Sequence, residues 1–421
     1  MNCQNIIRGL CLILSPLPVW PQPPVLTLAP LLAEALARNP EVLAAQSRYE
    51  AARQRPDQAA SLPDPVFSLG YAANGSPRPF AGLGVEPTSN AGFMLSQELP
   101  FPGKRKLRGE VAQREAEAGR QDWLQAQLSV VARVKQAFHE LHHAWEVIEL
   151  MERQRELLRK FLRITEARYA AGRAAQQDVL QAQTQLSILE IRIGKMEQEK
   201  RSREAELNAL RSSPPDAPLG RPEPAPSRRL PIGLEELTRQ AREHSPLLAR
   251  EEKMIQRAEL AVNLARKDYY PDYTVSAGYF HMGRMPDMYQ LRVDFKLPAQ
   301  FWRKQRAGVA EQVHQLGAAR HSLVAAGQAL MFRIRDEHLI AESSARLMEI
   351  YTTTVLPQAS LALESAIPAY EAGRVEFLTL LTGFLTVLDY QEKFHEEMLR
   401  YQVALARLEE MTGIPLTEAS Q

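Results

Sequence analysis

The chain has 421 residues, a formal net charge of +1 and 24% charged residues, so it can form two or three ordinary domains and has no strong field to attract nucleic acid. Its only cysteines, Cys3 and Cys11, exclude a disulfide framework and a cysteine metal site. No apolar run approaches the ~18–20 residues that a spanning helix needs, which excludes a helical integral membrane protein.

Residues 1–22 have features of a shortened secretory signal, because Arg8 precedes an apolar segment that ends in a proline-rich stretch. The apolar segment is near the lower length limit for a signal, and no Ala-x-Ala site follows it. A disordered tail is the alternative interpretation. Cys11 is a poor lipid-attachment candidate, because too little apolar sequence precedes it.

Four landmarks occur twice, in the same order and about 200 residues apart. They are Leu32–Pro40 with Leu237–Pro246, Pro63-Asp64-Pro65 with Pro271-Asp272, Leu99-Pro100 with Leu297-Pro298, and Tyr169-Ala-Ala-Gly172-Arg173 with Tyr370-Glu-Ala-Gly373-Arg374. A period this long is too large for a solenoid unit and indicates a duplicated half-molecule. We therefore expect repeat 1 at residues 23–212 and repeat 2 at 233–421, with a proline-rich linker at 213–232.

Four short segments alternate between apolar and polar residues, as β-strands do. They are residues 66–73, 92–99, 273–281 and 288–297. Their lengths suit transmembrane barrel strands, which need ~9–11 residues, although a half-buried hairpin in a soluble protein gives the same pattern. Four strands cannot close a membrane barrel, whose smallest examples have ~8, and lipid tolerates no open edge. If these strands cross a membrane, the chain must oligomerise.

The rest of the chain has helical periodicity. The clearest apolar series is Val131, Val134, Phe138, Leu141, Trp145 and Ile148. Its steps of three and four residues are typical of helices that coil around a neighbour. No proline occurs in residues 104–213, so a helix from about Lys104 to Tyr169 would be ~100 Å long. Repeat 2 has the same run from about Arg303, which Pro357 and Pro368 should kink or interrupt.

Duplicated halves, very long helices, a strand pair in each half and Tyr-x-x-Gly at the helix turns together resemble the TolC family of outer-membrane efflux proteins, from about Leu26 to Leu416. The segment Gln97-Glu-Leu-Pro-Phe-Pro-Gly-Lys104 is most similar to the branch that serves heavy-metal cation efflux. Asp178-Val-Leu-Gln-Ala-Gln183 matches the family's motif after the turn. The resemblance implies a mainly α fold with a small β part: a homotrimer with one twelve-stranded outer-membrane barrel and a periplasmic α-barrel of long helices.

The resemblance also implies a function. The chain would be the passive outer-membrane channel of a tripartite efflux pump for heavy-metal cations. Its partners would be its own copies, a periplasmic adaptor (membrane-fusion) protein, an inner-membrane RND-type pump reached through the adaptor, and outer-membrane lipid. No nucleic acid or cofactor is expected. A channel of the same fold for drug or protein (type I) export is one alternative. A soluble coiled-coil adaptor or scaffold is another, although a membrane-fusion adaptor should carry a lipoyl-like β domain, which is not seen here.

The sequence has no Gly-x-Ser-x-Gly, no phosphate-binding loop and no Gly-x-Gly-x-x-Gly. Its one His-Glu-x-x-His spans residues 139–143, within the long predicted helix. We therefore expect no enzyme activity. The energy for transport must then come from a partner.

The two Tyr-x-x-Gly-Arg turns are the candidate adaptor-contact tip, formed by Gly172, Arg173, Gly373 and Arg374. Glycine allows the positive φ of a tight helix end, so a plain helix cap is the alternative interpretation. Relatives in the family often carry an acidic pair after the second turn, where this chain has Thr379 and Thr382. The gate candidates are Asp178, Glu371, Glu376, Thr379 and Thr382.

Two clusters contain side chains that bind metals. His139 and His143 are one helical turn apart and could hold zinc, but no nearby acid or cysteine completes the site, and a packed helix wall is the simpler interpretation. The loop between the last two strands carries His281, Met282, Met285 and Met288. Thioethers with histidine suit Cu(I) or Ag(I), whereas incidental methionines in an exposed loop are the simpler interpretation.

Overall fold

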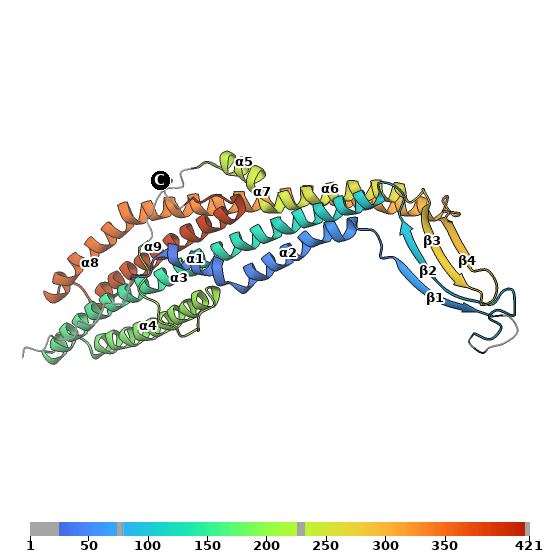
Figure 1. Cartoon of the computed structure of the whole chain (residues 1–421). Coiled ribbons are helices and arrows are strands. Elements are labelled where there is room, and N and C mark those ends of the chain that lie inside the picture. Colours follow the sequence, from blue (N-terminus) through green and yellow to red (C-terminus); the bar gives the residue numbers. More distant parts are fainter. Residues whose placement is uncertain (1–24, 74–77, 79, 225–231, 417–421) are drawn as a thin grey trace, which may run out of the picture.

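The computed structural model describes residues 25–73, 78, 80–224 and 232–416. The expected signal or disordered segment at 1–22 lies outside them. The described chain is a long helical shaft with one antiparallel sheet at its end (Figure 1). None of the helices in these ranges combines the length and apolarity needed to cross a membrane.

Both repeats contain the same succession of elements. Repeat 1 comprises α1 (Leu28–Arg38), α2 (Pro40–Ala60), β1 (Val66–Ala72), β2 (Asn90–Leu99), α3 (Lys104–Ala170) and α4 (Gln176–Leu210). Repeat 2 comprises α5 (Leu234–His244), α6 (Pro246–Lys267), β3 (Asp272–His281), β4 (Met288–Lys296), α7 (Lys304–Ile350), the π-helical turn η1 (Tyr351–Val355), α8 (Leu356–Glu371) and α9 (Phe377–Thr412). The predicted mainly α fold with a small β part and two structural repeats is confirmed, and each strand bound lies within two residues of its predicted position.

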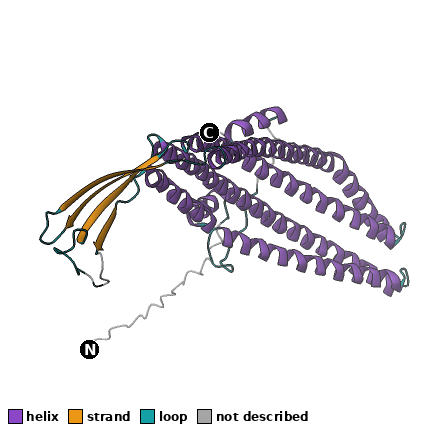
Figure 2. Cartoon of the chain, turned by 90° about the vertical axis from the view of Figure 1, so that its right-hand side faces the viewer, coloured by secondary structure: helices purple, strands orange, loops and turns teal. Residues whose placement is uncertain are grey.

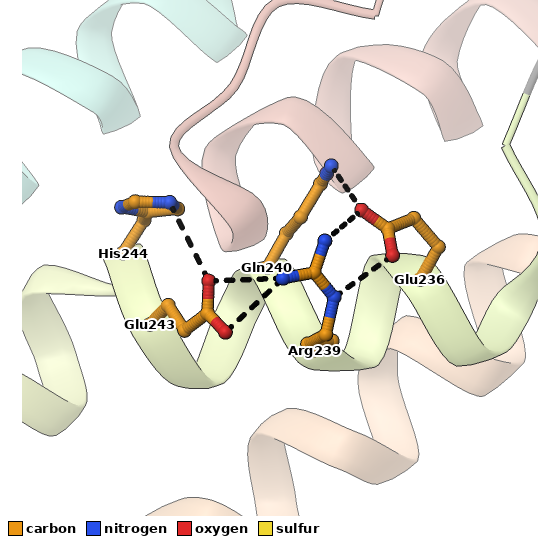
Figure 3. A network of polar contacts seen from close by, with 5 residues as sticks. All are labelled: Glu236, Arg239, Gln240, Glu243 and His244. Carbon is orange, nitrogen blue, oxygen red and sulfur yellow. Dashed lines mark hydrogen bonds and ion pairs between the residues drawn. The ribbon is translucent and has the colours of Figure 1, made fainter.

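The short helices α1 and α5 are anchored by apolar side chains on one face. In α5, Leu237 and Ala241 are fully buried, and the opposite face carries an exposed charge ladder. Arg239 Nη2 lies 2.6 Å from Glu236 and Nη1 lies 3.2 Å from Glu243 (Figure 3). Pairs spaced three and four residues apart on one helix face support the helix.

The longest helix, α3, is the central element of the shaft. It has 67 residues, so it is about 100 Å long, as predicted. Phe138 and Leu141 are buried in a cluster formed with α1, α2 and α4. Lys135 is buried as well, and its Nζ lies 2.6 Å from Glu409 Oε2 of α9. The predicted coiled-helix seam is therefore only one of several buried faces of α3.

The second long helical run breaks at one of its two prolines. Pro357 is the second residue of α8 and directly follows the π-helical turn Tyr351–Val355, so the predicted interruption there is confirmed. The predicted interruption at Pro368 is wrong, because α8 continues through it to Glu371. A proline removes the hydrogen bond of its missing N–H group, and its ring crowds the carbonyl of the residue four positions earlier. Both effects fall in the last turn of α8, which ends at Glu371.

The sheet has the order β1-β2-β3-β4, with every pair antiparallel. Its register places Leu69 opposite Phe93, Phe93 opposite Tyr279 and Tyr279 opposite Tyr289. Because side chains alternate along a strand, this row and its neighbours form one apolar face. The exposed large side chains of this face are Phe67, Leu69, Phe93, Leu95, Tyr289, Leu291, Val293 and Phe295.

The other face of the sheet is polar. Ser96, Ser276 and Arg292 are paired across three strands on this face, and the hydroxyls of Ser96 and Ser276 lie 2.9 Å apart. β1 and β4 are the edge strands, each with a neighbour on one side only. Figure 2 shows the sheet extending away from the helices as a separate blade.

The described part of the linker, residues 213–224, contains neither a helix nor a strand. It runs along repeat 1, where Leu26 N–H donates to Arg221 O at 2.8 Å and Glu223 N–H donates to Leu26 O at 2.9 Å. The Arg221 guanidinium lies 2.8 Å from Glu146 and 2.7 Å from Glu149 of α3. This part of the linker is therefore held against the shaft.

Candidate functional site at the helical tip

The two glycine turns lie at the same end of the molecule, opposite the sheet (Figures 1 and 2). Gly172 follows α3 with a φ of 69°, and Gly373 follows α8 with a φ of 72°. These are left-handed values that glycine adopts without the steric cost of a Cβ. The sequence predicted both turns correctly.

The turns have the same hydrogen bonds. In repeat 1, Gly172 N–H donates to Tyr169 O at 2.9 Å and Arg173 N–H donates to Arg168 O at 2.8 Å. In repeat 2, Gly373 N–H donates to Tyr370 O at 3.0 Å and Arg374 N–H donates to Ala369 O at 2.8 Å. Both are Schellman helix ends, and they leave the side chains of Arg173 and Arg374 exposed.

The gate candidates surround these turns. Asp178 is the third residue of α4 and is half-buried, and Thr379 is the third residue of α9 and is exposed. An acid in the first turn of a helix interacts favourably with the helix dipole, so Asp178 also has a local structural role. Glu371, Glu376 and Thr382 are exposed.

A contact that the sequence did not predict joins the two turns. The Arg168 guanidinium donates to Tyr370 O and lies 4.5 Å from the centroid of the Tyr370 ring. The Tyr370 hydroxyl lies 3.0 Å from Thr165 Oγ1. No repeated motif marks this contact, because the position equivalent to Arg168 is Ala369.

The equivalent tyrosines have opposite environments. Tyr169 is 47% exposed, whereas Tyr370 is 2% exposed. Below Tyr370, a cluster that includes Phe161, Phe377 and Phe384 packs α3, α4, α8 and α9 together, with the rings of Phe161 and Phe384 5.8 Å apart and edge to face. The tip is therefore a packed four-helix end with two similar turns in different surroundings.

The histidines of α3 are buried in the shaft. Burial, with the nearby charges of His142 and Lys135, lowers the pKa of His139 to about 3. Burial, with the charges of His395 of α9 and His142, lowers the pKa of His143 to about 4. Among the described residues, no three histidine, cysteine or acidic side chains are arranged to hold a metal ion. Neutral histidines in a packed helix wall account for this cluster.

The loop between β3 and β4 is ordered by Asp287, which the sequence interpretation did not single out. Its carboxylate lies 2.8 Å from His281 Nδ1 and accepts a 2.6 Å hydrogen bond from the Tyr279 hydroxyl. This arrangement leaves Nε2 of His281 as the nitrogen that can bind a metal, as in carboxylate–histidine pairs. Met282 and Met285 are half-buried, and Met288 is 38% exposed. The soft-metal site stays a prediction.

Comparisons with known proteins agree with this architecture. Residues 31–211 match the family described as outer membrane efflux protein. Cobalt-zinc-cadmium resistance protein CzcC of Cupriavidus metallidurans is 24% identical over 396 residues, which cover 92% of this chain and 88% of the relative. The crystal structure of CusC has a TM-score of 0.79 and 15% identity, with 91% of each chain covered. The outer membrane protein VceC of Vibrio cholerae has a TM-score of 0.78 and 18% identity, with 92% of this chain and 96% of VceC covered.

A duplicated helical shaft that ends in one four-stranded sheet is thus the fold of outer-membrane channel proteins. Residues 31–211 match the outer membrane efflux protein family, so the resemblance that the sequence indicated is confirmed.

Proposed function

We propose that this chain forms, as a homotrimer, the passive outer-membrane channel of a tripartite efflux pump that exports heavy-metal cations. The observation that carries the proposal is the sheet. Its apolar face is continuous and exposed, with Leu69 78% and Leu291 77% exposed. Soluble proteins rarely expose such a face, whereas lipid favours it. Since lipid tolerates no open strand edge, the edges of β1 and β4 require further copies of the chain.

The helical tip supports a docking role for the other end of the molecule. Arg173 and Arg374 are exposed there, and so are Leu180 and Leu378, at 53% and 57%. Exposed leucines beside cations suit a periplasmic adaptor protein, through which the channel would reach an RND-type pump. In this mechanism adaptor contact separates the tip helices and cargo then diffuses through the lumen.

The cargo is proposed from the relative whose name states cobalt, zinc and cadmium resistance. Drug or protein export through the same fold is the alternative. The metal sensitivity and the drug sensitivity of a deletion strain distinguish the two. Sensitivity to zinc, cobalt or cadmium, restored by this chain, supports metal export, and sensitivity to drugs alone contradicts it.

A planar bilayer tests the channel itself. The full-length protein should give stepwise conductance and migrate as a trimer in detergent. Leu69→Lys should prevent insertion, because a lysine on the lipid face of a strand costs about 2–4 kcal/mol at mid-membrane. Ser68→Lys, one residue away on the polar face, is the matched control and should still insert. A water-soluble monomer without conductance would refute the channel.

A further inference from the structure

An ion pair joins the two repeats within one chain. The residue types that form it occur a second time at the outer edges of that chain, where they have no partner within the part that the structure describes. At the base of the sheet, Lys104 is the first residue of α3 and is 3% exposed. Its Nζ lies 2.9 Å from Asp272 Oδ1 and 3.3 Å from Asp268 Oδ1. Asp272 Oδ1 also accepts a 2.7 Å hydrogen bond from Phe101 N–H. This junction fastens the start of α3 in repeat 1 to the start of β3 in repeat 2.

The duplicated sequence contains the same partners a second time. Lys304 is the first residue of α7, as Lys104 is of α3. Asp64 follows Pro63 before β1, as Asp272 follows Pro271. Both side chains are exposed. Among the described residues, neither the Lys304 amine nor the Asp64 carboxylate makes a hydrogen bond or an ion pair.

Among the helices that the structure describes, the long helix α7 also lacks a neighbour that α3 has. α6 packs along both α3 and α7, whereas α2 packs along α3 and has no comparable contact with α7. α7 exposes apolar side chains in its first half, including Val313 at 46% and Val324 at 56%. A second copy that brings its α2 against α7 would give α7 the arrangement that α3 already has.

The β2–β3 register fixes how the edges would meet. It pairs Leu99 with Tyr273 and Leu95 with Ala277. Leu99-Pro100 at the end of β2 corresponds to Leu297-Pro298 at the end of β4, and Pro271-Asp272 before β3 corresponds to Pro63-Asp64 before β1. If β4 and β1 meet in the register of β2 and β3, Val293 lies opposite Leu69. The differences in residue number between β2 and β4 and between β3 and β1 are both even, so apolar side chains of one strand lie opposite apolar side chains of the other. A slip of one residue would turn every side chain to the wrong face.

In the trimer of the proposed function, β4 of one copy adjoins β1 of the next. We propose that these two strands pair in this register and that Lys304 forms an ion pair with Asp64 of the neighbouring copy. The inference rests on the oligomer of the proposed function and adds its register and its ionic contact. The occupant of the β1 and β4 edges is a second copy of this chain. The charge complementarity of Lys304 and Asp64 and the open side of α7 support that choice.

A carbodiimide tests the ion pair, because it joins a carboxylate to an adjacent amine. The trimer should yield covalent multimers whose linked peptides contain Asp64 and Lys304. Lys304→Gln should abolish this link, and Lys106→Gln, at another exposed lysine of a helix start, should not. Lys304→Asp should weaken the trimer, and Asp64→Lys in the same chain should restore it. A trimer without the link, or a double variant no better than Lys304→Asp, overturns the ion pair.

Cysteine pairs test the register in a background without Cys3 and Cys11. The proposal places Arg292 opposite Gly70, on the polar face, and a Cβ at Gly70 meets no atom within 4 Å. Arg292→Cys with Gly70→Cys should give disulfide-linked multimers on oxidation. The pair slipped by two residues, Arg292→Cys with Ser68→Cys, should not. Multimers from the slipped pair alone overturn the register and leave the channel standing, whereas a monomer without conductance removes the proposed function itself.

Discussion

Arg168 of α3 holds Tyr370 of α8 by two contacts at once, a hydrogen bond to its carbonyl oxygen and a position 4.5 Å from its ring centroid. The two residues belong to different repeats and lie on either side of the tip. The contact therefore couples the α3–α4 turn to the α8–α9 turn. If adaptor docking opens the tip, this contact is one that must break.

Arg168→Ala should loosen both turns. A hydrogen bond from a charged donor contributes about 1.5–3 kcal/mol, so opening of the turns should become about tenfold or more easier. Hydrogen exchange of the amides around Gly172 and Gly373 measures this opening. Arg173→Ala is the matched control, since that exposed side chain makes no contact with Tyr370. Equal exchange in both variants would mean that Arg168 does not couple the turns.

The two turn glycines should differ in their tolerance of alanine. At either position alanine must adopt a left-handed φ, which costs about 1–2 kcal/mol. A Cβ at Gly172 meets nothing within 4 Å, but at Gly373 it lies 3.3 Å from Arg168 Nη2. Gly373→Ala should therefore lower the free energy of unfolding more than Gly172→Ala does, as measured by thermal or denaturant unfolding.

Gly194→Ala provides the opposite control for this pair. Gly194 lies within α4, where a Cβ also meets nothing within 4 Å, and alanine should stabilise a helix interior by about 0.5–1 kcal/mol. Equal losses at Gly172 and Gly373 would contradict the role assigned to the Arg168 contact.

Acid should destabilise the shaft through its buried histidines. The pKa of His139 falls to about 3 in the folded protein, from an ordinary value of 6.5. Between these values the unfolded state binds a proton that the folded state does not. The stabilisation is therefore complete above about pH 6.5 and is lost as the pH falls, by about 1.4 kcal/mol per pH unit for each such group.

Unfolding of the His139→Leu variant at pH 7 and pH 5 checks this expectation. The variant should lose less stability between the two values than the unchanged protein. His314→Leu, at an exposed histidine of α7, should leave the pH dependence as it was. An unaltered slope in the His139 variant would show that this group does not control the acid response.

The loop between β3 and β4 allows a direct test of the soft-metal hypothesis. If His281 and the three methionines bind Cu(I) or Ag(I), replacement of Met282, Met285 and Met288 by leucine should abolish binding, as measured by competition with a chelator. Asp287→Asn should weaken binding by about 10–100-fold, because Asp287 orients His281. Met348→Leu, on α7, should have no effect. Binding that survives the triple replacement would exclude the loop site.

The sequence by itself determined the local structure. Alternating residues defined the four strands because a strand turns successive side chains to opposite faces. Glycine defined both tip turns, because their positive φ favours a residue without a Cβ. Pro357 marked the break after α7, but Pro368 did not mark one, since its effect depends on how much helix follows it. Duplicated halves, very long helices, a strand pair in each half and the Tyr-x-x-Gly turns together indicated the resemblance to the efflux family.

Only the tertiary structure decided which side chains meet across the repeats. Tyr169 and Tyr370 occupy equivalent positions, yet one is exposed and the other is buried against Arg168. The sequence could not reveal this difference, because it comes from packing between helices about 200 residues apart. Burial of Lys104 and exposure of Lys304 have the same origin. Local patterns record what a segment forms, and the environment of a side chain depends on which distant element packs over it.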